Sequence, residues 1–158
     1  MSPAGLEIVE AQEGEPRRQA FEIRRRVFVV EQDCPPEEEF DAHDADSHHY
    51  LATVEGEPAG AARWRVVGHE GVAAAKLERF AVLPAYRGRG VGRALVARLL
   101  EDARAAGHRR FLIHAQSHLE SFYGAFGFER RGEELMEAGI PHVAMWREEA
   151  SDSVRSIP

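Results

Sequence analysis

The sequence has a single cysteine, Cys34, so an internal disulfide is excluded. No run approaches the ~18 to 20 apolar residues needed to cross a bilayer, which excludes a membrane-spanning helix. The first ten residues lack the basic segment and the apolar core of a secretory signal, so we expect a cytoplasmic location. Of the 158 residues, 44% are hydrophobic and 30% are charged, which predicts one soluble domain over residues 1–147 with a polar tail over 148–158.

The sequence also lacks a broad basic surface. The formal net charge is −7, and the acidic segment, residues 31–46, holds eight acids without any Lys or Arg. Binding to a nucleic-acid backbone would need basic residues spread over a whole face. We therefore expect neither nucleic acid nor a membrane as partner, and the sequence leaves the oligomeric state open, a homodimer included.

A glycine-rich turn, Arg87-Gly88-Arg89-Gly90-Val91-Gly92, lies between the apolar run Leu77–Leu83 and a helical stretch that begins near Gly90. Glycines let the backbone approach a ligand closely, and the N-terminus of a helix presents N–H groups and a positive dipole end to an anion. The fifteen residues from Arg79 to Arg93 include four arginines and no acid. This pattern predicts a binding site for a polyphosphate.

Two common phosphate motifs are absent. No Gly-Lys-Ser or Gly-Lys-Thr follows the glycines, which excludes the Walker pattern. The dinucleotide fingerprint needs a third glycine where Arg93 stands, and it needs an acid for the ribose where the next predicted strand, Phe111–Ala115, is followed by Gln116-Ser117. The pattern that the glycine-rich turn does match is Arg-x-x-Gly-x-Gly following a strand.

A second element, Phe122-Tyr123-Gly124-Ala125-Phe126-Gly127-Phe128, follows the first in the chain. Together the two resemble motifs of the GNAT acyltransferase superfamily, which uses them for acetyl-coenzyme A. The resemblance covers most of residues 6–147. Further blocks look like the small ElaA/YjcF-like branch of that superfamily: Arg24–Gln32, Lys76–Arg79, His114–Gln116 and Ala138–His142.

The order of the predicted elements favours an α+β fold with a mixed sheet. A short strand over Leu6–Val9 precedes a helix with Pro16 in its first turn, and an antiparallel meander follows. The helix after Gly90, closed by Gly107, joins two strands as a right-handed crossover, which implies a parallel pair. The other predicted elements are strands over 50–54, 59–67, 74–83, 111–115, 128–131 and 143–147 and a helix over 119–126. The resemblance implies the GNAT acyl-CoA N-acyltransferase fold, a mostly antiparallel sheet with a splayed central parallel pair and flanking helices.

The first helix has an apolar face. Ala20, Ile23, Val27 and Val30 recur at helical spacing, which predicts that they face the core. The arginines of this helix fall mostly on the opposite face, where a solvated surface is the expected role. These are Arg17, Arg18, Arg24 and Arg25.

In sheets that contain parallel strands, ligands bind at the carboxyl ends of those strands. The resemblance implies that pantetheine lies between the strand ending at Val82 and the strand ending at Ala115, and that it pairs with backbone groups of the first strand. The pyrophosphate would lie on backbone amides of the glycine-rich turn, while Arg87 and Arg89 could instead be surface charges. Many relatives carry Asn where Gln116 stands. The predicted contacts are Phe80, Ala81, Val82, Arg87, Gly88, Arg89, Gly90, Val91, Gly92, Arg93, Gln116 and Phe122.

Acetyl transfer to an amine needs a base and a proton donor for the departing thiolate. Glu78 lies two residues before Phe80 on a predicted strand and resembles the strand glutamate that many GNAT enzymes use as base. A salt bridge to Lys76, Arg79 or Arg65 is the alternative. Tyr123 resembles the family's proton donor, with a packed aromatic residue as its alternative, and backbone N–H near Val82 would polarise the carbonyl.

The acidic segment, the histidines and the cysteine each allow both a functional and a structural role. The acidic segment could attract a cationic amine, although a solvated loop is the simpler expectation. The spacing of its histidines and aspartates matches no zinc template, so we predict no metal. His114 and His142 could contact the amine or relay a proton, or be structural, and Cys34 is expected to be an ordinary thiol.

The sequence thus predicts a single-domain N-acetyltransferase. It would move acetyl from acetyl-CoA to a primary amine, with a cationic amine as one alternative, by direct attack in a ternary complex, without a metal. The amine belongs to a small molecule or, as the alternative, to a protein lysine or N-terminus. Two other classes stay open, namely an acyl-CoA sensor without activity and a nucleotide-binding protein.

Overall fold

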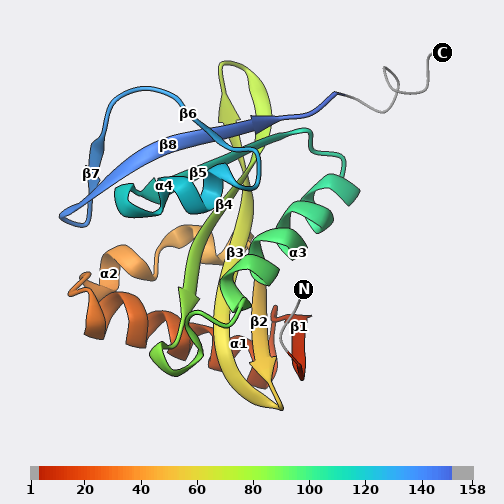
Figure 1. The fold of residues 1–158 in the computed structure, drawn as a ribbon, viewed down its shortest axis with the longest axis vertical. Coiled ribbons are helices and arrows are strands. Elements are labelled where there is room, and N and C mark those ends of the chain that lie inside the picture. Colours follow the sequence, from red (N-terminus) through yellow and green to blue (C-terminus); the bar gives the residue numbers. More distant parts are fainter. Residues whose placement is uncertain (1–3, 151–158) are drawn as a thin grey trace. The chain divides into compact units, whose positions relative to one another are not determined.

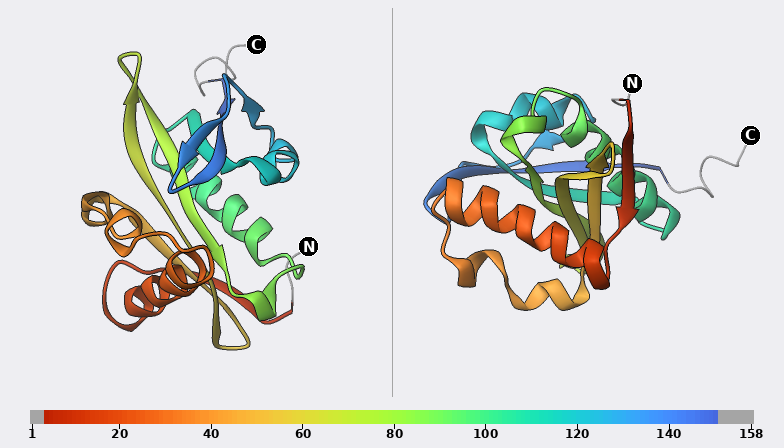
Figure 2. Two further views of the ribbon diagram at one scale, coloured as in Figure 1. Left: turned by 90° about the vertical axis from the view of Figure 1, so that its left-hand side faces the viewer. Right: turned by 90° about the horizontal axis from the view of Figure 1, so that it is seen from below.

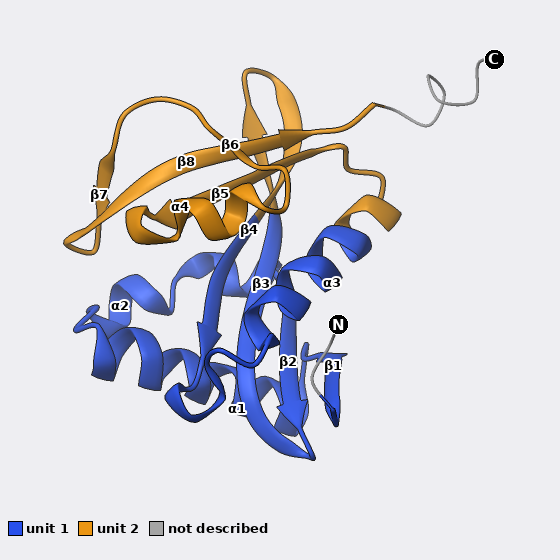
Figure 3. Ribbon diagram, in the orientation of Figure 1, with its two compact units in different colours: residues 1–65, 77–102 blue, residues 66–76, 103–158 orange. Residues whose placement is uncertain are grey.

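The computed structural model describes residues 4–150, which fall into two compact units (Figures 1 and 3). Unit 1 contains the described residues up to Arg65 together with Leu77–Asp102. Unit 2 contains Val66–Lys76 together with the described residues from Ala103. The predicted single domain over 1–147 stays a prediction.

Unit 1 is built on strands β1 (Leu6–Glu10), β2 (His48–Val54), β3 (Glu57–His69) and β4 (Val72–Val82), of which β3 and β4 continue into unit 2. Strand β1 pairs antiparallel with β2, and β2 pairs antiparallel with β3. Helix α1 (Gly14–Arg24) and the short α2 (Pro36–Glu39) lie on one face of this part of the sheet, and the start of α3 (Val91–Ala105) lies on the other (Figure 2). The remaining segments are the π-helical η1 (Arg25–Glu31) and the 3₁₀ segments η2 (Ala42–Asp46) and η3 (Pro84–Tyr86).

The core of unit 1 joins the first helix to the sheet. Its buried members come from α1, η1 and the central strands, with Phe21, Phe28 and Leu83 packed around them. Burial of this apolar face, rather than helix propensity alone, stabilises the helix. The buried members are Ala11, Ala20, Ile23, Val27, Leu51, Ala61 and Ala81.

Two predictions for the first helix are wrong. Val30 is 61% exposed because η1 is π-helical, and its wider turns break the 3.6-residue spacing that placed Val30 with Ile23 and Val27. Arg24 was expected on the solvated face but is 1% exposed. Its guanidinium is buried because carboxylates from the acidic segment surround it.

Unit 2 contains strands β5 (Arg110–Gln116), β6 (Glu129–Arg130), β7 (Leu135–Glu137) and β8 (Ile140–Glu148), with η4 (Ser117–Leu119) and α4 (Glu120–Gly124) between β5 and β6. Strand β5 runs parallel to β4, with Lys76 opposite Leu112, and antiparallel to β8. Strands β6 and β7 both pair antiparallel with β8. The predicted mixed sheet with a parallel pair is confirmed, and β7 is a strand that was not among the predicted elements.

The predicted end of the long helix is also confirmed. Gly107 has a φ of +101°, and its N–H donates to the carbonyl oxygen of Arg104, while the N–H of His108 donates to that of Ala103. These two bonds satisfy the last carbonyls of α3 in the Schellman arrangement. Among residues 4–150, no helix is long and apolar enough to cross a membrane.

Candidate active site

The predicted phosphate loop leads directly into α3. Gly88 and Gly90 have φ values of +75° and +85°, a left-handed conformation that costs glycine little. The first turn of an α-helix has N–H groups with no acceptor inside the helix, and the positive end of its dipole lies there. Helical bonding begins where the N–H of Ala94 donates to the carbonyl oxygen of Gly90 at 3.0 Å. The backbone of this loop therefore fits an anionic ligand.

The arginine side chains of the loop contact protein groups. Arg87 donates through both terminal nitrogens to the Glu31 carboxylate at 2.6 and 2.8 Å, and through Nε to the carbonyl oxygen of Val82 at 2.9 Å. The hydrogen bond from Arg87 lowers the pKa of Glu31, which keeps that carboxylate ionised. The Arg89 guanidinium lies 5.3 Å from the centre of the Tyr86 ring. Arg87 thus ties the loop to the ends of η1 and β4.

Gly60 allows β3 to pack closely against the start of α3. A Cβ at this position would lie 3.0 Å from Val91 Cγ1 and 3.1 Å from both the Ala81 carbonyl oxygen and Leu95 Cδ1. We expect Gly60→Ala to lower the free energy of unfolding by about 1–3 kcal/mol, because backbone and buried side chains must shift. Chemical denaturation measures this change.

The matched control is Gly68→Ala on the same strand, since no atom lies within 4 Å of a Cβ built there. Its free energy of unfolding is expected to stay within about 0.5 kcal/mol of the wild-type value. Equal losses in the two variants would contradict the packing argument.

Strand β4 has an irregular backbone where the cofactor contacts are predicted. Arg79 has a φ of +61°, in the left-handed region that a side chain adopts at a cost. The alternation that predicted a shared face for Glu78 and Phe80 does not continue through such a residue. The side chain of Arg79 pairs with Glu39 and Asp41, at 3.2 Å to each carboxylate.

Glu78 lies in an ion pair. Its Oε2 accepts hydrogen bonds from Nε of Arg63 and from Nε of Arg65, each at 2.8 Å, and only 8% of the residue is exposed. The sequence left two roles open for Glu78, and the salt bridge to Arg65 is one of them. Two guanidinium groups favour the ionised carboxylate and occupy an oxygen that a base would use.

Glu78 belongs to a larger buried network in unit 1, which we call the charge network. Arg24 donates to Glu39 Oε2 at 2.7 Å and to Asp44 Oδ1 at 2.8 Å. Arg63, with no exposed surface, donates to the same Asp44 oxygen at 2.6 Å. Four arginines face four carboxylates, so their formal charges balance. The members are Arg24, Arg63, Arg65, Arg79, Glu39, Asp41, Asp44 and Glu78.

The charge network corrects the interpretation of the acidic segment. Glu39 and Asp44 are 2% and 7% exposed, so neither is part of a solvated loop, and both carboxylates already pair with arginines. Burial alone would raise the pKa of Asp41, but the hydrogen bond and charge of Arg63, with the charge of Arg79, lower it overall. These carboxylates therefore have a structural role, because they pair with arginines of the protein itself.

The histidines of this region have structural contacts. His49 is 1% exposed, and its Nε2 donates to the carbonyl oxygen of Asp44 at 2.8 Å, while the His48 ring stacks on Trp64 at 4.1 Å. In the described part of the chain, no three His, Cys, Asp or Glu side chains gather where they could hold a metal ion. Burial raises the pKa of the Cys34 thiol, which disfavours the reactive thiolate.

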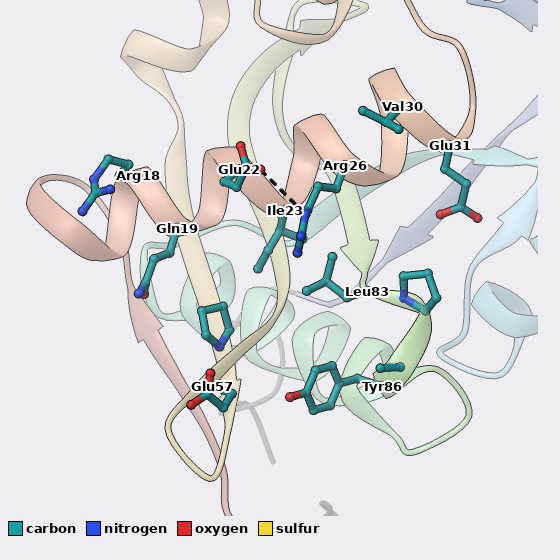
Figure 4. Close-up of a pocket in the computed structure, with 13 residues that line it drawn as sticks. Arg18, Gln19, Glu22, Ile23, Arg26, Val30, Glu31, Glu57, Leu83 and Tyr86 are labelled. Atoms are coloured by element: carbon teal, nitrogen blue, oxygen red, sulfur yellow. Dashed lines mark ion pairs between the residues drawn. The ribbon is translucent and has the colours of Figure 1, made fainter.

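A groove of about 820 Å³ opens in unit 1 beside the segment that leads into the loop (Figure 4). Leu83, Tyr86 and Ile23 form apolar parts of its wall, and Arg26 and Glu31 are among the charged side chains at its rim. Glu31 at the rim also pairs with Arg87 of the predicted phosphate loop, so this ion pair links the groove to the loop.

Unit 2 carries the predicted proton donor. Tyr123 lies on α4 with 5% of its surface exposed, and burial raises its pKa. The neighbouring Phe122 ring contacts it edge-on, with ring centres 5.0 Å apart. Gln116 is the last residue of β5 and lies opposite His142 on β8. The second part of the predicted site, Gln116, Phe122 and Tyr123, thus lies within one unit.

Unit 2 also contains a histidine–carboxylate pair that the sequence did not reveal. His114 Nδ1 on β5 lies 2.5 Å from Oε2 of Glu137 on β7. The sequence marked His114 but gave no reason to single out Glu137. The signal that could have found it is the Ala138-Gly139 turn, with both residues at positive φ, which joins β7 to β8 as a hairpin.

Residues 12–149 match the acetyltransferase (GNAT) domain, and the chain belongs to this family. It is 36% identical to the uncharacterized N-acetyltransferase YjcF of Bacillus subtilis over 144 residues, which cover 90% of this chain and 100% of YjcF. It is 35% identical to the Escherichia coli protein ElaA over 133 residues, 81% of this chain and 84% of ElaA. The predicted ElaA/YjcF-like branch is confirmed.

Solved structures agree on the fold. The crystal structure of Escherichia coli ElaA superimposes with a TM-score of 0.75 at 30% identity, covering 90% of this chain and 98% of ElaA. An acyl-CoA N-acyltransferase from Pseudomonas aeruginosa gives a TM-score of 0.73, with the same identity and coverage. A GNAT acetyltransferase of Elizabethkingia anophelis with acetyl-CoA bound shares the fold at a TM-score of 0.63 and 15% identity, covering 92% of this chain and 99% of that chain.

Proposed function

We propose that the protein transfers acetyl from acetyl-CoA to a primary amine of a small molecule. The observation that carries the proposal is the Arg-x-x-Gly-x-Gly loop, whose left-handed Gly88 and Gly90 open the 15-residue helix α3. Membership of the acetyltransferase family and a neighbour of the same fold that holds acetyl-CoA support it.

The donor would be held by backbone more than by arginine side chains. Arg87 is bonded to Glu31 and Val82, so the amides at the start of α3 are the proposed phosphate contacts. Main-chain groups of Phe80, Ala81 and Val82 are the proposed pantetheine contacts of unit 1, and Gln116 and Phe122 stay proposed contacts of unit 2.

Tyr123 is the proposed proton donor to the departing thiolate. Because burial raises its pKa, the phenol keeps its proton across the pH range of ordinary assays. We assign Glu78 to the ion pairs with Arg63 and Arg65 in place of the base that the resemblance implied. A backbone N–H near Val82 is the proposed partner of the thioester carbonyl oxygen.

Calorimetric titration tests the donor. We expect acetyl-CoA to bind at micromolar or lower concentration and ADP to bind at least tenfold more weakly, because ADP lacks the pantetheine that β4 would pair with. Equal binding of the two ligands would favour a nucleotide-binding protein, and no binding of acetyl-CoA would contradict the proposal.

Thiol release with a panel of primary amines then tests transfer. Release above the hydrolysis background, with acetylated amine detected by mass spectrometry, is the expected result. Tight binding of acetyl-CoA without acetylation of any amine would instead identify a sensor of acyl-CoA.

A further inference from the structure

The pair of His114 and Glu137 has the geometry of an oriented base. The carboxylate of Glu137 can only accept at neutral pH, so Nδ1 of His114 carries the proton of their 2.5 Å hydrogen bond. In the neutral ring, the lone pair then belongs to Nε2. A carboxylate in this position fixes the tautomer and stabilises the positive charge that the ring acquires with a second proton.

Charged groups from two other strands lie near the pair. Burial alone would raise the pKa of Glu137, but its hydrogen bond with His114 and the charges of His114, His142 and Lys76 lower it overall. Lys76 lies on β4, opposite Leu112 of β5, and His142 lies on β8, opposite Gln116. Glu137 is therefore an ionised carboxylate in a partly desolvated setting, where its interaction with His114 is stronger than on an open surface.

The pair lies where a substrate can reach it. His114 is two residues before the carboxyl end of β5, the strand that runs parallel to β4, and ligands of parallel strands bind at that end. Gln116, two residues on, points to the same face of β5 as His114. The side chains of His114 and Glu137 are 26% and 36% exposed, so both are half-buried but accessible.

We propose that His114 is the general base of the acetyl transfer and that Glu137 is its positioning residue. This inference rests on the proposed function. The amine nitrogen uses its lone pair to form the bond to the acetyl carbon, and its proton passes to Nε2 of His114. The carbon–sulfur bond breaks with its electron pair on sulfur, and the thiolate takes a proton from Tyr123. The products are the N-acetylated amine and free coenzyme A.

The contrast with Glu78 supports this assignment. Glu78 is 8% exposed and bonded to two arginines, whereas His114 is accessible and bonded to a carboxylate. A guanidinium partner opposes protonation of a base, and a carboxylate partner favours it.

The test compares His114→Gln with wild type at saturating acetyl-CoA and several pH values. We expect kcat to fall by about 10²-fold, with binding of acetyl-CoA unchanged by calorimetry. The pH dependence of the rate should also change in the variant, because its glutamine cannot accept the proton of the amine. For Glu137→Gln, we expect about tenfold lower kcat with the binding of acetyl-CoA unchanged, because the ring of His114 is no longer held in one orientation.

The matched control is His69→Gln, which removes a partly exposed histidine at the end of β3, paired with Glu70 at 3.6 Å in the same unit. Its kcat and pH profile should match the wild type. Wild-type turnover with an unchanged rate and profile in His114→Gln would overturn the base assignment alone. No turnover by wild type with any amine would overturn the proposed function, and the base assignment with it.

Nitrogen-15 NMR of the wild-type histidine rings gives a readout that needs neither turnover nor a variant. The neutral ring of His114 is expected in the Nδ1–H tautomer. The Nε2–H tautomer would show that Glu137 does not orient the ring, and it would overturn the inference.

Discussion

Replacing Tyr123 with phenylalanine is expected to lower kcat by roughly 10²-fold or more while leaving the affinity for acetyl-CoA nearly unchanged. The substitution removes one oxygen atom and keeps the buried ring, so packing on α4 changes little. What is lost is the proton for the thiolate. Steady-state kinetics with a saturating amine and calorimetry with acetyl-CoA measure the two quantities separately.

Tyr86→Phe is the control for this variant. It removes the same hydroxyl from a tyrosine beside the phosphate loop, and its ring can still lie under Arg89. Its kcat should fall far less than that of Tyr123→Phe, because its hydroxyl has no part in the proposed proton transfer. An unchanged kcat in Tyr123→Phe would remove Tyr123 from the chemistry and leave it a packed aromatic residue.

The raised pKa of Tyr123 also predicts how the activity depends on alkaline pH. Because burial raises the pKa of Tyr123 above that of a free phenol, its proton is lost only at more alkaline pH than usual. Tyr123 should therefore cause no alkaline loss of activity below about pH 10.

The Arg63→Met variant is expected to lose about 3–5 kcal/mol of the free energy of unfolding at pH 7. Arg63 has no exposed surface and pairs with Asp41, Asp44 and Glu78, so its removal leaves these carboxylates short of positive charge. Thermal unfolding should show a midpoint lower by roughly 10 °C. This is the largest effect on stability that we expect from one substitution.

The stability deficit of Arg63→Met should depend on pH. In wild type, the lowered pKa of Asp41 adds stability above the pKa of the unfolded chain, and this is lost as the pH falls through the folded value. In the variant, Asp41 has lost its Arg63 partner and can take a proton at higher pH, which removes part of the uncompensated negative charge. The difference between the two proteins should therefore shrink as the pH falls toward about 4.

Arg18→Met is the control, because Arg18 pairs with Glu15 on the surface, with 75% of its side chain exposed. Surface pairs contribute little, and its loss should stay below about 1 kcal/mol. Similar losses in the two variants, or a deficit that does not change with pH, would contradict the charge network as a stabilising unit.

Much of the fold could be predicted because local patterns decide it. The apolar segments that form β2 and β3, the apolar stripe of α3 and the left-handed Gly107 are all properties of short segments. Motif spacing likewise indicated the phosphate loop and the Phe122-Tyr123 element without any tertiary information.

What could not be predicted depends on pairings distant in the sequence. Arg24 looked like a surface residue because its partners, Glu39 and Asp44, lie in a segment that resembles a solvated loop. Glu137 could not be assigned a role from the sequence, because only the β7–β8 hairpin places it beside His114, 23 residues earlier in the chain. Val30 was misplaced because no local signal marked the change to π-helix.

The charge network also constrains how this sequence can change over evolutionary time. Each arginine of the network touches at least one carboxylate of the network, so a single substitution leaves the formal charges of the network unbalanced. Lineages that alter one of these eight positions must alter a partner as well, or replace the whole set with apolar residues of similar volume. We therefore expect the acidic segment, which looks in the sequence like a tolerant surface loop, to change together with the arginines of α1, β3 and β4.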